Sequence, residues 1–316
     1  MITLQNFSFS CMVNYRNFLI AAVLSAAFSA SGAPGADYRI VAADQSTSSL
    51  VMVSGAPDAQ AEILWRWDSR KDSKILPEYR NSFRNIDECK PSADGSEILA
   101  NASCGGVAAV DVATASVKWY AYLPEWNAGP HSLCVLPDGK VAVANSTGVD
   151  ALQIIDVSAA PLDPARQKVV KAMSLPGAHG VVWDARRGSL FALGYTNLYE
   201  LADSSADMSV SVKRSWDYSA KLCDQYGHDL VADGSGGYFL TNHTAVWHLD
   251  PDADRWTKVR DMANVKSFSR DAKKGDLITI AKEKWWTDEL KIIEPDGTTR
   301  VVGPFPGARF YKARWM

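Results

Sequence analysis

Short apolar runs, each followed by a polar turn, recur along residues 38–316. In the unit that begins at Glu88, ECKPSADGSEILANA contains two such runs on either side of the turn Asp94-Gly95. A third run ends at Asp111, and the aromatic run VKWYAYL (117–123) is the fourth. Alternating apolar positions bounded by Asp and Gly are typical of β-strands joined by hairpins. The pattern therefore predicts a unit of four β-strands.

The four-strand unit is repeated along the chain. Further units begin at Pro130, Ala178, Gly227 and Val265. A period of about 40–50 residues made of short strands is typical of a β-propeller. The first unit, which starts at YRIVAADQ (38–45), lacks one strand, and the last residues, FYKARWM (310–316), have a strand pattern with no unit after them.

We therefore predict an all-β fold, a six-bladed β-propeller that forms a single domain over residues 38–316. The C-terminal strand joins the first blade and closes the ring. Closure of this kind removes exposed sheet edges, which otherwise invite aggregation.

Composition narrows the class of protein. Hydrophobic residues make up 47% of the 316 residues, enough for a large core. The formal net charge is −3 and no basic run occurs, so we expect no nucleic-acid partner. The four cysteines beyond residue 33 leave the disulfide pairing open, and Cys89 and Cys104 are the favoured pair because they fall in one unit.

Residues 1–33 are predicted to be a signal peptide. Arg16 precedes the apolar stretch FLIAAVLSAAFSA (18–30), and small residues follow it. This stretch is too short for a membrane-spanning helix, and no later segment could span a membrane. We expect the protein to be secreted, extracellular and monomeric.

Three of the five histidines occupy the same place in consecutive units. His131, His179 and His228 are separated by 48 residues (131 to 179) and 49 residues (179 to 228). The start of each innermost strand of a propeller faces the central axis, so these side chains should converge on one axial pocket. The same alignment assigns three other residues to this position: Cys89, Lys266 and Lys312.

Polar and aromatic side chains are predicted to surround the axial pocket, because the second strands of the blades end on the same face. The predicted residues are Asp44, Gln45, Tyr195, Asn242, Glu283, Trp285 and Trp286. A concave site with convergent polar groups is typical of ligand binding. Lysines would bind carboxylates, and tryptophans would pack against the face of a sugar ring. The predicted partner is therefore an acidic oligo- or polysaccharide.

The motifs WYAYLPEW, GPHSLCVLPDG, LPGAHGVVWD, GHDLVADGSGG and KEKWWTDELKI resemble those of a secreted six-bladed propeller family of unknown function. They are also similar to the YVTN and quinoprotein-like propeller superfamily. The resemblance covers roughly residues 38–316 and implies the fold, whereas propellers host many functions. Some propeller-shaped polysaccharide lyases place histidines at the axis, sometimes with a divalent metal, and the chain is similar in that feature.

The predicted pocket suits β-elimination from a uronate-containing glycan. Lys266 and Lys312, or a metal, would neutralise the sugar carboxylate, and a neutral histidine would remove the adjacent proton, with help from Tyr195. His131, His179 and His228 could also hold a divalent metal such as Zn, Mn or Ca.

Two alternatives stay open. The first is a binding module without chemistry, in which the histidines only donate and accept hydrogen bonds. The second is a glycoside hydrolase, which needs two carboxyl groups about 5–9 Å apart. The candidate carboxylates Asp44, Glu88, Asp229 and Glu283 come from different blades, and their spacing singles out no pair.

Overall fold

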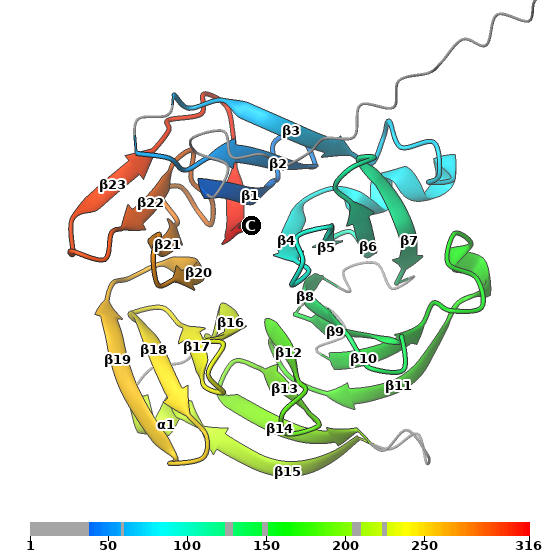
Figure 1. Cartoon of the computed structure of the whole chain (residues 1–316). Coiled ribbons are helices and arrows are strands. Elements are labelled where there is room, and N and C mark those ends of the chain that lie inside the picture. Colours follow the sequence, from blue (N-terminus) through cyan, green and yellow to red (C-terminus); the bar gives the residue numbers. More distant parts are fainter. Residues whose placement is uncertain (1–37, 58–59, 124–128, 147–150, 204–209, 223–225) are drawn as a thin grey trace, which may run out of the picture. The chain divides into compact units, whose positions relative to one another are not determined.

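The structure is a computed structural model that describes residues 38–316, except 58–59, 124–128, 147–150, 204–209 and 223–225. The predicted signal peptide, residues 1–33, lies outside the described residues, as does Cys223. Over the described residues the predicted fold is confirmed: six four-stranded antiparallel sheets form a ring around a central axis (Figure 1).

The strands occupy equivalent places in the six sheets. The innermost strands are β24 (Phe310–Trp315), β4 (Ile86–Pro91), β8 (Pro130–Val135), β12 (Gly180–Asp184), β16 (Asp229–Ala232) and β20 (Val265–Asp271). The second strands are β1 (Arg39–Asp44), β5 (Glu97–Ala102), β9 (Val141–Asn145), β13 (Ser189–Leu193), β17 (Tyr238–Thr241) and β21 (Gly275–Ile280). The third strands are β2 (Ser49–Ser54), β6 (Gly106–Asp111), β10 (Ala151–Asp156), β14 (Asn197–Asp203), β18 (Ala245–Asp250) and β22 (Leu290–Ile293).

The outer strands are β3 (Ile63–Asp68), β7 (Ser116–Tyr122), β11 (Lys168–Ser174), β15 (Val210–Asp217), β19 (Arg255–Asp261) and β23 (Thr299–Val302). The helices among the described residues include α1 (Tyr218–Leu222) and two 3₁₀ helices, η2 (Pro77–Phe83) and η3 (Pro164–Arg166). None of these helices is long and apolar enough to cross a membrane.

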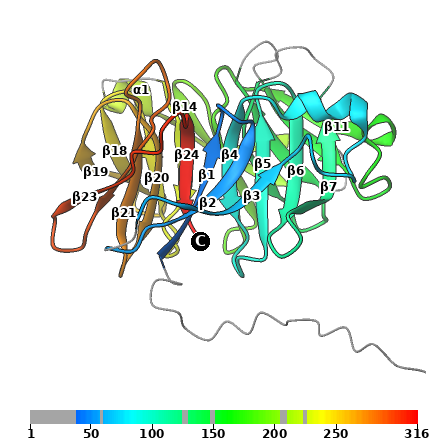
Figure 2. The same ribbon diagram turned by 90° about the horizontal axis from the view of Figure 1, so that it is seen from above.

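The predicted ring closure is confirmed. β24 pairs antiparallel with β1, with Ile40 opposite Trp315 and Ala42 opposite Ala313. In Figure 2, β24 lies between β1 and β20. The Trp315 indole Nε1 donates a hydrogen bond to the carbonyl of Gly275 on the sixth blade, at 3.1 Å. The last strand therefore joins the first and the sixth blades.

The hydrophobic core is divided among the interfaces between neighbouring blades. The described residues form six buried apolar clusters, and each cluster combines residues of two adjacent sheets. The strand β9, for example, is buried at every position, and its residues alternate between two of these clusters. Burial of apolar surface is the dominant stabilising contribution, so the fold is stabilised blade against blade.

Two of the predicted hairpin turns depend on glycine. Gly95 has φ 68° between β4 and β5, and Gly139 has φ 81° between β8 and β9. This backbone region is open to glycine at no steric cost. The Asp-Gly pairs of the sequence therefore lie at the turns that the repeat predicted.

The favoured disulfide was wrong. Cys89 and Cys104 are free thiols. Cys89 is fully buried in the cluster between the first two blades, with Sγ 3.4 Å from the carbonyl oxygen of Lys312. Cys104 follows β5 and is half-buried. The two side chains lie in different environments, and burial raises the pKa of the Cys89 thiol, which makes it inert.

Candidate functional site

A cavity of about 390 Å³ lies where the innermost strands begin. Its lining residues are Gln45, Asn85, Asp87, Ser103, His131, Ser146, His179, Tyr195, Tyr226, His228, Lys266, Trp285 and Tyr311. The three aligned histidines and Lys266 therefore meet in one pocket, as their shared place in the repeat predicted.

One residue from each blade forms a ring around this axial pocket. In β4, Ile86 pairs with Ala102 and Glu88 with Asn101, so Asp87 lies in a bulge between them. His131 and Lys266 lie in corresponding register shifts of β8 and β20. A bulge redirects a side chain relative to a regular strand. We call the complete set the axial ring: Tyr311, Asp87, His131, His179, His228 and Lys266.

The sequence alignment was wrong at two of these six positions. Asp87 takes the place assigned to Cys89, and Tyr311 takes the place assigned to Lys312. Asp87 could have been found, because Asp87 and His131 both lie eight residues before the glycine of the next hairpin turn (87 to 95, 131 to 139). No hairpin turn follows β24 in the described chain, so the sequence offers no such count for Tyr311.

Local hydrogen bonds orient the imidazoles. His131 Nδ1 lies 2.6 Å from the carbonyl of Gly129, and His179 Nδ1 lies 2.8 Å from the carbonyl of Gly177. A carbonyl only accepts, so Nδ1 carries the proton in both residues and Nε2 keeps a lone pair. His228 Nε2 accepts a hydrogen bond from Lys266 Nζ at 3.0 Å.

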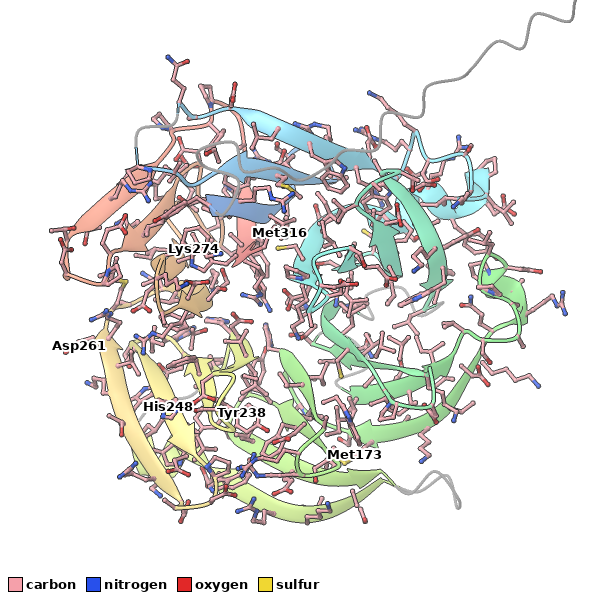
Figure 3. The ribbon with its side chains drawn as sticks, in the orientation of Figure 1. Met173, Tyr238, His248, Asp261, Lys274 and Met316 are labelled. Atoms are coloured by element: carbon pink, nitrogen blue, oxygen red, sulfur yellow. The ribbon has the colours of Figure 1, made fainter. Side chains whose placement is uncertain are left out.

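The imidazoles form a continuous arc. Ring centroids are 4.5 Å apart for His131 and His179, 5.6 Å for His179 and His228, and 5.1 Å for His228 and His243. The fifth histidine, His248, lies on β18 away from the axis (Figure 3), and its Nε2 is 2.7 Å from Asp233 Oδ2. Four of the five histidines therefore lie in one arc, and three of them, His131, His179 and His228, line the pocket.

Burial keeps these imidazoles neutral. It lowers the pKa of His131 to about 4 and that of His228 to about 2, and it lowers the pKa of His179 well below its usual value. Nearby positive charge on Lys312 acts in the same direction on all three. At neutral pH His131, His179 and His228 are therefore uncharged.

Two groups of the axial ring titrate near neutrality. Burial raises the pKa of Asp87 to about 8, although Ser103 Oγ and Gln45 Nε2 donate hydrogen bonds to its carboxylate at 2.5 and 2.7 Å. Burial, followed by the charge of Lys312, lowers the pKa of Lys266 to about 8. Below pH 8 the pocket therefore holds one ammonium group and a neutral carboxyl group.

Lys312 does not line the pocket. Its side chain is fully buried one residue deeper, where Nζ donates to Glu88 Oε2 at 3.3 Å and to Asp229 Oδ1 at 3.2 Å. Arg314 Nη2 bonds the same two carboxylates at 2.9 Å and 2.7 Å. These four residues, which we call the ionic floor, join three blades across the axis. The predicted register of β24 was wrong by one residue: Tyr311 faces the pocket, and Lys312 binds protein carboxylates instead of a ligand carboxylate.

The other predicted residues divide between the pocket and its surroundings. Gln45, Tyr195 and Trp285 line the axial pocket. Asp44 and Asn242 are buried and stabilise turns, because the carboxylate of Asp44 accepts from Thr47 Oγ1 and the Oδ1 of Asn242 from the amide of Ala245.

Glu283 and Trp286 line a neighbouring pocket instead. Asp87, Tyr311 and Asn85 are pocket residues that the sequence analysis missed.

No group of three His, Cys, Asp or Glu side chains in the described part of the chain is arranged to hold a metal ion. His131 and His179 each bond a backbone carbonyl through Nδ1, and Ser146 Oγ also lies 3.2 Å from His179 Nδ1 and 3.4 Å from its Nε2. The Lys266 ammonium lies against His228. The divalent metal stays a prediction.

The fold and the pocket define a class: a six-bladed β-propeller with an axial pocket lined by one side chain from each blade. The chain belongs to DUF6528, a family of unknown function whose model matches residues 32–316. No match was found among the curated proteins.

Two solved structures share the propeller fold. The first is a protein of unknown function from Bacteroides caccae, with a TM-score of 0.58 and 11% identity, covering 87% of this chain and 97% of that chain. The second is the β-propeller domain of Cps50 (Swd1) from Myceliophteria thermophila, with a TM-score of 0.51 and 12% identity, covering 82% of this chain and 80% of that one. At these identities the likeness extends to the fold alone.

Proposed function

We propose that the axial pocket binds an acidic sugar, with the sugar carboxylate on Lys266. One observation carries the proposal. The ammonium of Lys266 donates to a neutral imidazole, His228, and no carboxylate pairs with it among the described residues. A half-buried cation without a counter-ion is unusual inside a protein, where buried charges are normally paired. An anionic ligand would supply the missing charge.

The remaining lining suits the rest of a sugar. His131 presents a lone pair at Nε2, and His179 Nε2 lies 3.4 Å from Ser146 Oγ, so a sugar hydroxyl group could bond to either imidazole or to the serine. Tyr195 and Tyr226 lie on one side, with ring centroids 5.1 Å apart. A sugar ring has an apolar face that can pack on these aromatic rings and hydroxyl groups that can bond to the polar side chains.

The same groups can perform β-elimination on a uronate residue. Lys266 neutralises the carboxylate, which makes the proton on the adjacent carbon, C5, more acidic. The Nε2 lone pair of His131 or His179 takes this proton, the C5–H electron pair forms the C4=C5 double bond, and the C4–O bond breaks. The leaving oxygen takes a proton from the Asp87 carboxyl group, which is protonated below pH 8, or from the Tyr195 hydroxyl group. A secreted protein with this activity would act on extracellular glycans.

A binding module without chemistry is the second candidate. The observation that favours it is the low pKa of the imidazoles, about 4 for His131 and about 2 for His228. A base is most effective when its pKa lies near the working pH, so such imidazoles are weak bases until a bound carboxylate raises their pKa. In this case the pocket would retain the sugar unchanged.

One experiment separates these outcomes. The protein is incubated with polygalacturonate, alginate and a glucuronate polymer, and the ultraviolet absorbance of the unsaturated product is followed. Binding of the same polymers is measured by calorimetry. Lys266→Met should abolish binding, and Arg255→Gln, on the exposed part of β19, should change neither binding nor elimination. His131→Asn and His179→Asn, made separately, should change binding little, and the variant that lacks the base should lose elimination.

Binding without product would establish the module. Full retention of binding in Lys266→Met would refute the proposed site. The predicted metal is checked on the same samples by elemental analysis before and after dialysis against a chelator, and the predicted secretion by comparing culture medium with cell lysate.

A further inference from the structure

A second pocket lies beside the axial pocket. Its volume is about 480 Å³, and it is formed by residues 282–288, between β21 and β22, and 307–309, before β24. Its lining residues are Lys282, Glu283, Trp286, Thr287, Asp288, Gly307, Ala308 and Arg309. None of them lines the axial pocket.

Residues in direct contact line the two pockets at two places. Trp285 lines the axial pocket and Trp286 lines the second one, with ring centroids 5.6 Å apart and planes at 90°. Gln45 also lines the axial pocket and donates its backbone N–H to the carbonyl of Arg309, a residue of the second pocket, at 2.9 Å. A ligand that fills the axial pocket and continues past Trp285, which is 51% exposed, would therefore reach the second pocket.

The cations of the second pocket differ in their partners. Lys282 Nζ is neutralised by Asp288 at 3.1 Å and by Glu289 at 2.7 Å. The Arg309 guanidinium lies 4.9 Å from the centroid of Trp286 and has no hydrogen bond or ion pair with the other described residues. A guanidinium above an indole ring is attracted by the ring electrons, and its N–H groups stay available for hydrogen bonds. A guanidinium group can bind a carboxylate through two parallel N–H···O hydrogen bonds.

The backbone fixes this arrangement. The amide of Arg309 donates to Asp44 Oδ1 at 3.0 Å, and Asp44 is buried. The indole Nε1 of Trp286 is buried without an acceptor among the described residues. The Arg309 guanidinium offers a carboxylate site, the Trp286 indole offers a stacking surface, and the exposed Glu283 offers a carboxylate that accepts from hydroxyl groups.

From these observations we infer that the second pocket binds a second acidic sugar of the same chain. The ligand is then a uronate oligosaccharide of at least two residues, with one carboxylate on Lys266 and the next on Arg309. This inference rests on the proposed function of the axial pocket. It specifies the substrate class as oligosaccharides, because a free monosaccharide bound at Lys266 would not reach Arg309.

The test compares galacturonate oligomers of one, two and three residues by calorimetry. Binding of the second carboxylate should make the dimer about tenfold tighter than the monomer. Arg309→Gln keeps the backbone hydrogen bonds and should remove this gain, while the affinity for the monomer stays unchanged. Arg255→Gln is the matched control for loss of a surface charge, and thermal melting verifies that each variant folds.

Each outcome decides a separate point. Equal affinities for monomer and dimer would overturn the second pocket and leave the axial pocket supported. Equal weakening of monomer and dimer by Arg309→Gln would also overturn it, because Arg309 would then act on the axial pocket. If no oligomer binds, the proposed function fails and the second pocket fails with it.

Discussion

The charge of the axial pocket should reverse near pH 8, and the affinity for an acidic sugar should fall with it. Lys266 and Asp87 both have a pKa of about 8. Below this pH, Lys266 is an ammonium group and Asp87 is a neutral carboxyl group. Above it, Lys266 loses its positive charge and Asp87 gains a negative one, so both changes weaken the binding of an anion.

The size of the effect follows from the fraction of protein in the competent state. With a pKa of about 8, the protonated fraction of one group falls about tenfold between about pH 6 and about pH 9. If binding requires Lys266 charged and Asp87 neutral, the affinity should fall about a hundredfold over this range. The groups that set these values are Lys312, which lowers the pKa of both, and the buried surroundings.

Calorimetry with galacturonate across this pH range measures the effect, and galactose, which lacks the carboxylate, is the control ligand. Asp87→Asn removes one of the two titrating groups, so the loss of affinity should shrink to about tenfold. A constant affinity for galacturonate from about pH 6 to about pH 9 would refute the assignment of Lys266 as the carboxylate-binding group.

Three further predictions concern stability and reactivity. The pKa of His228 is about 2 in the folded protein and about 6.5 in the unfolded chain, so the protein loses stability as the pH falls below about 6.5 and the unfolded chain takes up a proton. His228→Asn removes this proton uptake and should lessen the loss of unfolding free energy at about pH 5 by about 2 kcal/mol, measured by urea denaturation. The same stability difference between wild type and variant at about pH 7 and at about pH 5 would contradict this assignment. Arg314→Met leaves two buried carboxylates short of a partner and should destabilise the protein by about 3–5 kcal/mol in the same assay, whereas a loss below about 1 kcal/mol would show that the ionic floor contributes little. Iodoacetamide should label half-buried Cys104 in the native protein and leave Cys89 unmodified until denaturant is added, as mass spectrometry of the two peptides would show.

The sequence predicted the fold because a propeller repeats the same local pattern. Each blade needs apolar alternation and turn residues, which are visible in one dimension, and the unmatched strands at the two ends predicted the ring closure. The shared position of His131, His179 and His228 could be found for the same reason.

The position of each side chain along the propeller axis was harder to predict than the fold. Lys312 and Tyr311 are adjacent in sequence, yet one bonds carboxylates of the ionic floor and the other lines the pocket. A register shift between β24 and β1 decides which of them faces the ligand, and strand pairing over such a distance leaves no local signal. The ionic floor escaped prediction because Glu88 and Arg314 are 226 residues apart in sequence.

β24 is the last described strand that a ribosome would produce, and it carries Tyr311, Lys312 and Arg314 together. A chain without β24 would keep five complete four-stranded blades. It would lose Tyr311 from the axial ring and both cations, Lys312 and Arg314, from the ionic floor. The buried carboxylates of Glu88 and Asp229 would then lack these two partners, so pairing of the last strand also neutralises the centre of the ring.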